Sequence, residues 1–137
     1  MSEVSEIQKE MASAWFMSLR DEIVSEFERL ENAHSSGPLS DWAKGEFEVT
    51  KTNRHAEDGQ DAGGGLMSVL RGGRVFEKVG VNVSTVHGEL GEQAQTAMAA
   101  RKVVPGMKED PRFWASGISL VAHMQNPHCP AVHMNTR

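Results

Sequence analysis

Residues 113–137 read FWASGISLVAHMQNPHCPAVHMNTR and predict two β-strands joined by a turn. The run from Ile118 to Met124 is mostly apolar and is too short for a typical helix. Pro127 and Pro130 then interrupt regular structure, because a proline ring fixes φ and biases the preceding residue toward extended geometry. Residues 131–137 resume as a second strand, so the segment predicts a β-hairpin with a long loop.

The alternation of side chains along these two strands predicts a polar surface, because successive side chains on a strand point to opposite faces of the sheet. One face of the first strand holds Ser119, Val121 and His123, and one face of the second holds His133, Asn135 and Arg137. If the two faces coincide, one surface carries a hydroxyl, two imidazoles, an amide and a guanidinium. That composition is typical of a binding site rather than of a core.

The composition fits a single cytoplasmic domain. The chain has 137 residues, of which 39% are hydrophobic and 24% are charged, which suffices for one core. A net charge of −5 argues against nucleic acid or an anionic membrane as the main partner. Cys129 is the single cysteine, so we expect a reducing compartment. The N-terminus does not resemble a signal peptide, and no apolar run reaches membrane-spanning length.

Residues 5–33 predict one helix, because apolar side chains from Ile7 to Leu30 recur at spacings of three or four. We interpret this apolar stripe as a core-packing surface rather than as a cofactor groove, on the strength of its periodicity. The Ser-Ser-Gly-Pro sequence at 35–38 ends the helix.

The middle of the chain predicts further strands and a weak helix. Residues 46–52 alternate polar and apolar and predict a strand, whereas the charged, glycine-rich segment 53–65 predicts a loop. Gly72-Gly73 separates the strand-like runs 66–71 and 74–78, a strong hairpin signal. A third strand is expected from Val81, ending near His87-Gly88-Glu89, and a weak helix over 91–104. The pattern predicts an α+β fold with an antiparallel sheet, in one partial domain over 1–137 with its sheet-forming region at 46–137.

Three histidines, His123, His128 and His133, are candidates for a metal site. Their five-residue spacing matches no helical metal motif, and no paired cysteines accompany them. His123 and His133 across the hairpin supply two of the three or four ligands that a catalytic metal needs. Histidines that line a pocket for an organic ligand are at least as compatible with the sequence.

Arg137 suits recognition of a carboxylate, because a guanidinium offers a planar fork for bidentate pairing. Ser119 has no nucleophile-elbow pattern around it and is expected only to form hydrogen bonds. Cys129 is expected to be an inert thiol. His87 beside Glu89 is a weak candidate for a catalytic pair, since polar residues are ordinary at the end of a strand.

Two long runs carry a family resemblance: GGGLMSVLRGGRVFEKVGVNVSTVHGE at 63–89 and DPRFWASGISLVAHMQNPHCPAVHMNTR at 110–137. Both resemble the oxygen-dependent coproporphyrinogen III oxidases of haem biosynthesis. The resemblance implies a flat antiparallel sheet covered by helices, usually in a homodimer. It also implies oxidative decarboxylation of the ring A and B propionates of coproporphyrinogen III to vinyl groups, which yields protoporphyrinogen IX. Molecular oxygen is the implied co-substrate, with no flavin or haem.

The resemblance also implies roles for particular residues. His133 matches the catalytic acid/base, and His123 with His133 matches positions assigned to a divalent metal in some bacterial members. The implied substrate-binding residues are Ser119, Asn135, Thr136 and Arg137.

The sequence departs from the family pattern in length and in one motif. The family is longer, so we expect an N-terminal portion of such an enzyme. Thr52-Asn53-Arg54 lacks the family's tryptophan, and Ala62 replaces one of its glycines. An alternative is a non-catalytic fragment that binds a tetrapyrrole or mediates oligomerisation. A third hypothesis is a small metal-binding protein that uses His123, His128 and His133.

Overall fold

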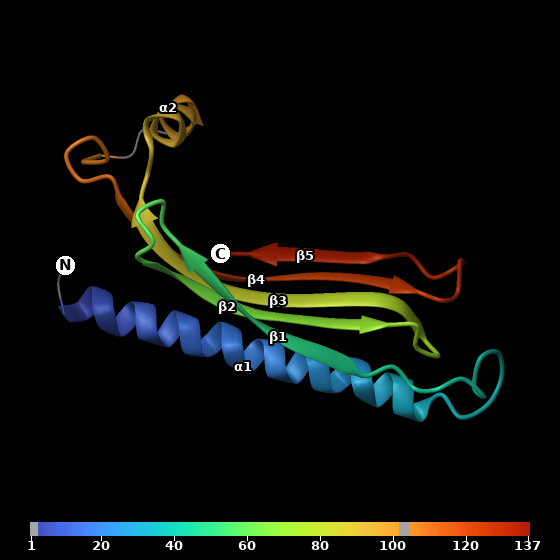
Figure 1. Cartoon of the computed structure of the whole chain (residues 1–137). Coiled ribbons are helices and arrows are strands. Elements are labelled where there is room, and N and C mark those ends of the chain that lie inside the picture. The colour runs from blue at the N-terminus through green and yellow to red at the C-terminus, as the bar shows by residue number, and fades with distance from the viewer. Residues whose placement is uncertain (1–2, 102–104) are drawn as a thin grey trace.

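The computed structural model describes residues 3–101 and 105–137 and contains a long helix packed on a five-stranded sheet (Figure 1). The elements are α1 (Glu3–Ala33), β1 (Phe47–His55), β2 (Asp61–Arg71), β3 (Phe76–Glu89), α2 (Glu92–Arg101), β4 (Arg112–Met124) and β5 (Val132–Thr136). The strands lie in the order β1-β2-β3-β4-β5, and each neighbouring pair is antiparallel. The α+β class with an antiparallel sheet is therefore confirmed. Neither described helix is long and apolar enough to cross a membrane.

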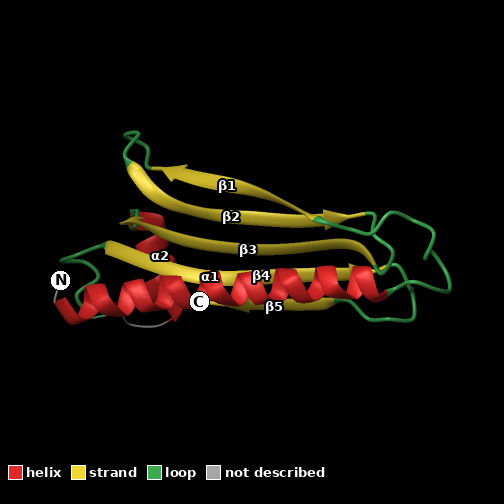
Figure 2. Ribbon diagram, turned by 90° about the horizontal axis from the view of Figure 1, so that it is seen from below, coloured by secondary structure: helices red, strands yellow, loops and turns green. Residues whose placement is uncertain are grey.

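Helix α1 covers one face of the sheet (Figure 2). Its inward side chains are Phe16, Leu19, Ile23, Val24 and Phe27. They pack on a buried cluster formed by Leu70, Phe76, Val79, Val81, Val83, Ile118, Leu120 and Ala122. The helix expected over 5–33 is confirmed, with its start two residues earlier.

The N-terminal part of the predicted apolar stripe does not reach the core. Ile7, Met11 and Trp15 are 51%, 68% and 62% exposed. A helix turns by about 100° per residue, so each step of four residues rotates a side chain by roughly 40° around the axis. From Ile7 to Phe27 these steps add up to roughly half a turn. The row of apolar residues therefore spirals around α1, and only its later members face the sheet.

The opposite face of the sheet, which we call the open face, carries no described helix. It is formed by alternate residues of the strands, among them Met67, Val69, Gly80, Asn82, Ser119, Val121, His133 and Asn135. Helix α2 lies past the end of β3, on the side of the sheet opposite α1, and none of its residues is buried (Figure 1). The described helices thus cover one face of the sheet, whereas the resemblance implies a sheet covered by helices.

The loop expected over 53–65 is wrong. Strand β1 continues to His55 and β2 begins at Asp61, which leaves a short turn between them. Gly63, Gly64 and Gly65 lie inside β2, where an added Cβ would collide with carbonyl oxygens of the neighbouring strands. These glycines allow close approach of strands rather than a flexible loop, and composition alone does not separate the two.

The other expected elements differ mainly in their bounds. Residues 76–78 of the first run and the run that begins at Val81 belong to one continuous strand, β3, whereas Arg74 and Val75 lie in the turn before it. The hairpin at Gly72-Gly73 is confirmed. The weak helix expected over 91–104 is α2, and its last three positions lie outside the described residues. Both strands of the predicted hairpin over 113–137 are present as β4 and β5, and β4 begins six residues before Ile118.

A buried carboxylate fastens the C-terminal end of α1 to the sheet. Glu31 is 0% exposed. Its Oε2 accepts hydrogen bonds from the backbone N–H groups of Gly45 (2.9 Å) and Arg74 (2.7 Å), and its Oε1 accepts those of Val75 and Phe76, both at 2.9 Å. Burial by itself raises the pKa of Glu31, but the four N–H donors favour the charged form and the net pKa is lowered. One side chain thus joins α1 to the segment before β1 and to the β2–β3 turn.

The chain also relies on a glycine where β5 ends. On the open face, Gly117 precedes Ser119 by two residues, and an added Cβ would lie 2.5 Å from the Thr136 oxygen and 2.7 Å from Arg137 Cγ. Strand β5 is an edge strand that pairs only with β4 among the described strands. The stem of Arg137 therefore crosses the sheet at a place kept free of a side chain.

We expect Glu31→Gln to lower the free energy of unfolding by about 3 kcal/mol, because the amide nitrogen would face backbone donors and leave them unpaired. Chemical denaturation measures this loss. Glu22→Gln, at an exposed position of the same helix, is the matched control and should change the free energy of unfolding by less than about 0.5 kcal/mol.

The stabilisation by Glu31 should also depend on pH. Because its pKa is lower in the folded protein, the stabilisation is fully present above the pKa of an unfolded glutamate, about 4.3. It is lost as the pH falls through the folded pKa. The difference in stability between the wild type and Glu31→Gln should therefore narrow from pH 7 toward pH 3, and a constant or widening difference would contradict this assignment.

Gly117→Ala should destabilise the protein by roughly 1–3 kcal/mol, because the added methyl group displaces the end of β5. Hydrogen exchange should quicken at the β5 amides. Gly80→Ala is the control, since a Cβ at this open-face position meets nothing within 4 Å. Equal effects of the two substitutions would show that the contact with Arg137 does not constrain β5.

Candidate functional site

The register of β4 and β5 brings most of the predicted site residues onto the open face. Ser119 pairs with Asn135, and Val121 pairs with His133. Paired residues of neighbouring strands point to the same side of a sheet, so the two predicted polar faces coincide. His123 follows Val121 by two residues and lies on this face as well.

The last two residues of the chain lie on different faces. Arg137 lies over Gly117 on the open face. Thr136 pairs with Ile118, which is buried under α1, so the Thr136 side chain lies on the helix side. The structure therefore places Ser119, His123, His133, Asn135 and Arg137 on one face, with His123 and Arg137 toward opposite ends of it, and it does not place the Thr136 hydroxyl there.

Strand β3 adds a polar residue that the sequence reasoning missed. Asn82 pairs with Ser119, which in turn pairs with Asn135, so a hydroxyl lies between two amides across three strands. The signal in the sequence is Asn82 between Val81 and Val83, both buried under α1. A polar residue between two core residues of a strand faces away from the core.

The floor of this surface is low. Gly80 lies beside Val121, and Gly65 and Gly117 flank Ser84. Gly65 and Gly80 have no side chains, so the backbone is partly accessible there, whereas Gly117 is buried and the stem of Arg137 lies over it. A flat, broad ligand fits such a floor better than a compact one.

The open face curls at one end. The Arg54 guanidinium carbon lies 5.9 Å from the centroid of the Phe113 ring, a distance compatible with a cation–π contact. Arg54 belongs to β1 and Phe113 to β4, and two strands separate them. Contact between such distant strands requires the β1–β2 end of the sheet to bend over the open face, as Figure 1 shows.

Basic side chains gather on the open face although the chain is acidic overall. Arg71 pairs with Lys78 at one end of it, and Arg137 lies at the other. Glu48, at the β1 edge, is an acidic residue on the same face. The open face therefore favours anionic ligands.

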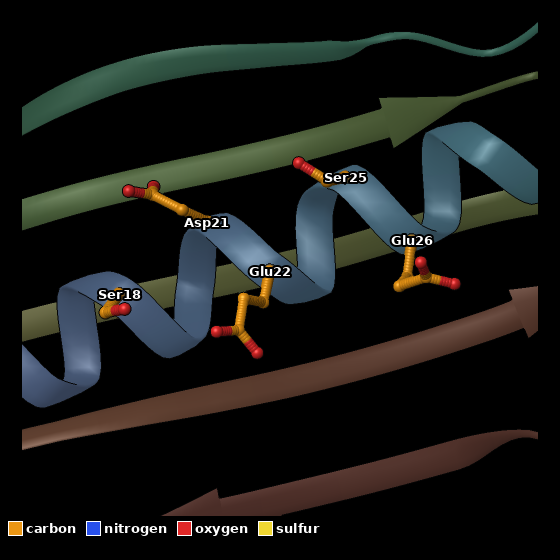
Figure 3. A pocket seen from close by; sticks show the side chains of 5 residues that line it. All are labelled: Ser18, Asp21, Glu22, Ser25 and Glu26. Atoms are coloured by element: carbon orange, nitrogen blue, oxygen red, sulfur yellow. The ribbon is translucent and has the colours of Figure 1, made fainter.

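The outer side of α1 has the opposite charge. Ser18, Asp21, Glu22, Ser25 and Glu26 line a shallow hollow there, and Figure 3 shows them on the helix with the strands behind it. These carboxylates would repel an anion, so this hollow does not compete with the open face for such a ligand.

The described residues do not fit a metal centre enclosed by protein ligands. No group of three or more His, Cys, Asp or Glu side chains is placed to hold a metal within residues 3–101 and 105–137. His123 and His133 share the open face, but the partner of His123 across β3 is Lys78, whose positive charge works against a bound cation.

The remaining candidates lie apart from the open-face residues. His87 pairs with Trp114 and lies on the α1 side of the sheet, as Glu89 does two residues later. His128 and Cys129 are exposed in the β4–β5 loop, and Cys129 is a free thiol. None of these four side chains lies on the open face.

Comparison with known proteins agrees with the resemblance. The family model described as Coproporphyrinogen III oxidase matches residues 11–137. Proteins named oxygen-dependent coproporphyrinogen-III oxidase from Rickettsia bellii (strain RML369-C) and Rickettsia felis are 44% and 43% identical to the chain over 129 residues. The matched region is 94% of this chain and 41% of each relative. On these matches, the chain belongs to the coproporphyrinogen III oxidase family.

Proposed function

We propose that this chain supplies the substrate-binding sheet of an oxygen-dependent coproporphyrinogen III oxidase. The proposed reaction converts the ring A and B propionates of coproporphyrinogen III to vinyl groups and yields protoporphyrinogen IX. The observation that carries the proposal is the gathering of Ser119, His133, Asn135 and Arg137 on one uncovered, cation-rich face.

The proposed chemistry asks for positioning and proton transfer. Each propionate loses its carboxylate as carbon dioxide and a hydrogen from the neighbouring carbon, and the two electrons released reduce oxygen to hydrogen peroxide. The balance is one propionate, one oxygen molecule and one proton in, and one vinyl group, one carbon dioxide and one peroxide out. The substrate is electron-rich, so the protein mainly orients it and limits side reactions.

We assign the proton-transfer role to His133. Imidazole is the side chain best suited to accept and return a proton near neutral pH. His133 is exposed and lies in the same row as Val121 and Gly80, so the low floor beside it leaves room for a broad macrocycle. This placement supports the proposal that His133 reaches a hydrogen of the substrate, on a pyrrole or on a propionate.

The residues near His133 suit a propionate and the polar groups of such a substrate. Arg137 offers a guanidinium fork to a propionate. Ser119 and Asn135, directly paired, offer a hydroxyl and an amide to polar groups of the macrocycle or its side chains. A role for Thr136 in substrate binding would have to use its backbone, because its side chain lies on the α1 side.

The alternative function is binding without turnover. The chain spans 41% of the length of the relatives it matches, and one face of its sheet is uncovered by described helices. A face of this kind can bind a ligand without forming a complete catalytic site. Turnover and binding therefore have to be measured separately.

We also infer a cytoplasmic homodimer. The lone, free Cys129 suits a reducing compartment.

The homodimer is inferred from an exposed apolar line on α1, formed by Ile7, Met11 and Trp15, that a second copy would bury. Sedimentation equilibrium on the wild type and on Trp15→Glu tests the dimer, which should dissociate in the variant; a monomeric wild type would contradict the inference.

The experiment on function starts with the chain and coproporphyrinogen III under anaerobic conditions. Oxygen is then admitted, and product is followed by protoporphyrin fluorescence after oxidation. Product above the protein-free control establishes catalysis by this chain. Binding of the substrate without product establishes the alternative.

His133→Ala should reduce turnover by about 10²–10⁴-fold, the contribution typical of general acid–base catalysis. Binding of the substrate should stay close to that of the wild type, because Ser119, Asn135 and Arg137 remain. Turnover of the wild type and the variants is compared in this chain if it is active, and otherwise in its full-length context. His128→Ala, in the exposed loop, is the matched control, and equal turnover in the two variants would remove His133 from the proton-transfer role.

A further inference from the structure

We propose that Lys78, assisted by Arg71, anchors a second carboxylate of the ligand at the end of the open face remote from Arg137. This inference rests on the proposed function, because it takes the ligand to be a broad macrocycle with several carboxylates. It assigns a binding role to two residues of the β2–β3 hairpin.

Three side chains able to carry positive charge lie in one row across the sheet. Arg71 of β2 pairs with Lys78 of β3, and Lys78 pairs with His123 of β4. All three side chains are exposed. Their alternation with buried Leu70 and Val79 places Arg71 and Lys78 on the open face.

Glu48, which shares the open face, pairs with Val69 and not with a residue of this row. Like charges directly opposite one another on neighbouring strands are destabilising. Neither the Lys78 ammonium nor the Arg71 guanidinium forms an ion pair with a carboxylate among the described residues. A ligand carboxylate placed between them would relieve the repulsion and gain charge-assisted hydrogen bonds.

The distance between the two anchors favours separate carboxylates. Arg137 lies over Gly117, which pairs with Ser84, and Ser84 is six residues from Lys78 along β3. At about 3.3 Å per residue these rows are roughly 20 Å apart. The long side chains shorten this gap, but one carboxylate cannot contact both. Between the two rows lie the low floor at Gly80 and the polar row of Asn82 and Ser119.

The same arrangement gives His123 a different use from metal binding. Its imidazole lies next to the Lys78 ammonium, where an anion is favoured over a cation. His123 therefore serves this anchor as a further hydrogen-bond donor to the carboxylate.

Coproporphyrin III, the stable oxidised tetracarboxylate, is the probe for the test. The chain is titrated with it, and binding is followed by the change in porphyrin absorbance and by quenching of tryptophan fluorescence. Lys78→Gln should weaken binding by roughly tenfold, as expected for the loss of one charge-assisted hydrogen bond. Lys51→Gln is the matched control: it removes the same charge from the α1 side of β1 and should change the affinity by less than about twofold.

A double variant distinguishes two independent carboxylate anchors from a single shared anchor. If Lys78 and Arg137 hold different carboxylates, the fold-changes of Lys78→Gln and Arg137→Gln should multiply in the double variant, because distant sites contribute independently. Folding is not at risk, since Lys78→Gln removes a repulsive charge at an exposed position; circular dichroism and denaturation check this.

The outcomes distinguish this inference from the proposed function. If Lys78→Gln binds like Lys51→Gln while Arg137→Gln binds more weakly, the second anchor is overturned and the substrate face stands. The second anchor is also overturned if the double variant binds coproporphyrin III no more weakly than the more strongly affected single variant does. If the wild-type chain does not bind coproporphyrin III at all, both the anchor and the proposed substrate face are overturned.

Discussion

The arrangement of this protein depends on one buried carboxylate. Glu31 accepts four backbone hydrogen bonds and so holds the end of α1 against two separate segments of the sheet region. Position 73 requires glycine, because Glu31 Oε1 occupies the space that a Cβ would need. A helix fixed in this way along one face leaves the other face of the sheet free of described helices.

The strands divide the two tasks by alternation. Along β4, Ile118 and Leu120 are buried beneath α1, and Ser119 between them faces the other way. The same division holds on β3, where Asn82 lies between two buried valines. Core packing and the proposed ligand contacts therefore use the same short stretches of chain, so the packing that stabilises the sheet also fixes the position of its polar row.

Net charge describes this molecule poorly. The chain carries −5 overall, yet acidic side chains line the outside of α1 while Arg71, Lys78 and Arg137 lie on the open face. An overall acidic balance argued against large polyanionic partners, and it says nothing against a small ligand with several carboxylates. What matters for such a ligand is the charge of the face that it meets.

The period-two pattern of residues 113–137, the Gly72-Gly73 turn and the helical spacing over 5–33 determined the hairpins, the long helix and the antiparallel class. They also predicted a polar strand face, since these signals are local. The tertiary structure decided what local patterns do not contain: the pairing of Ser119 with Asn135, the role of Glu31, and the glycines inside β2. It also decided that Thr136 turns away and that Ile7, Met11 and Trp15 stay exposed. Each of these depends on which distant segment lies opposite, and that is set by packing across the whole sheet.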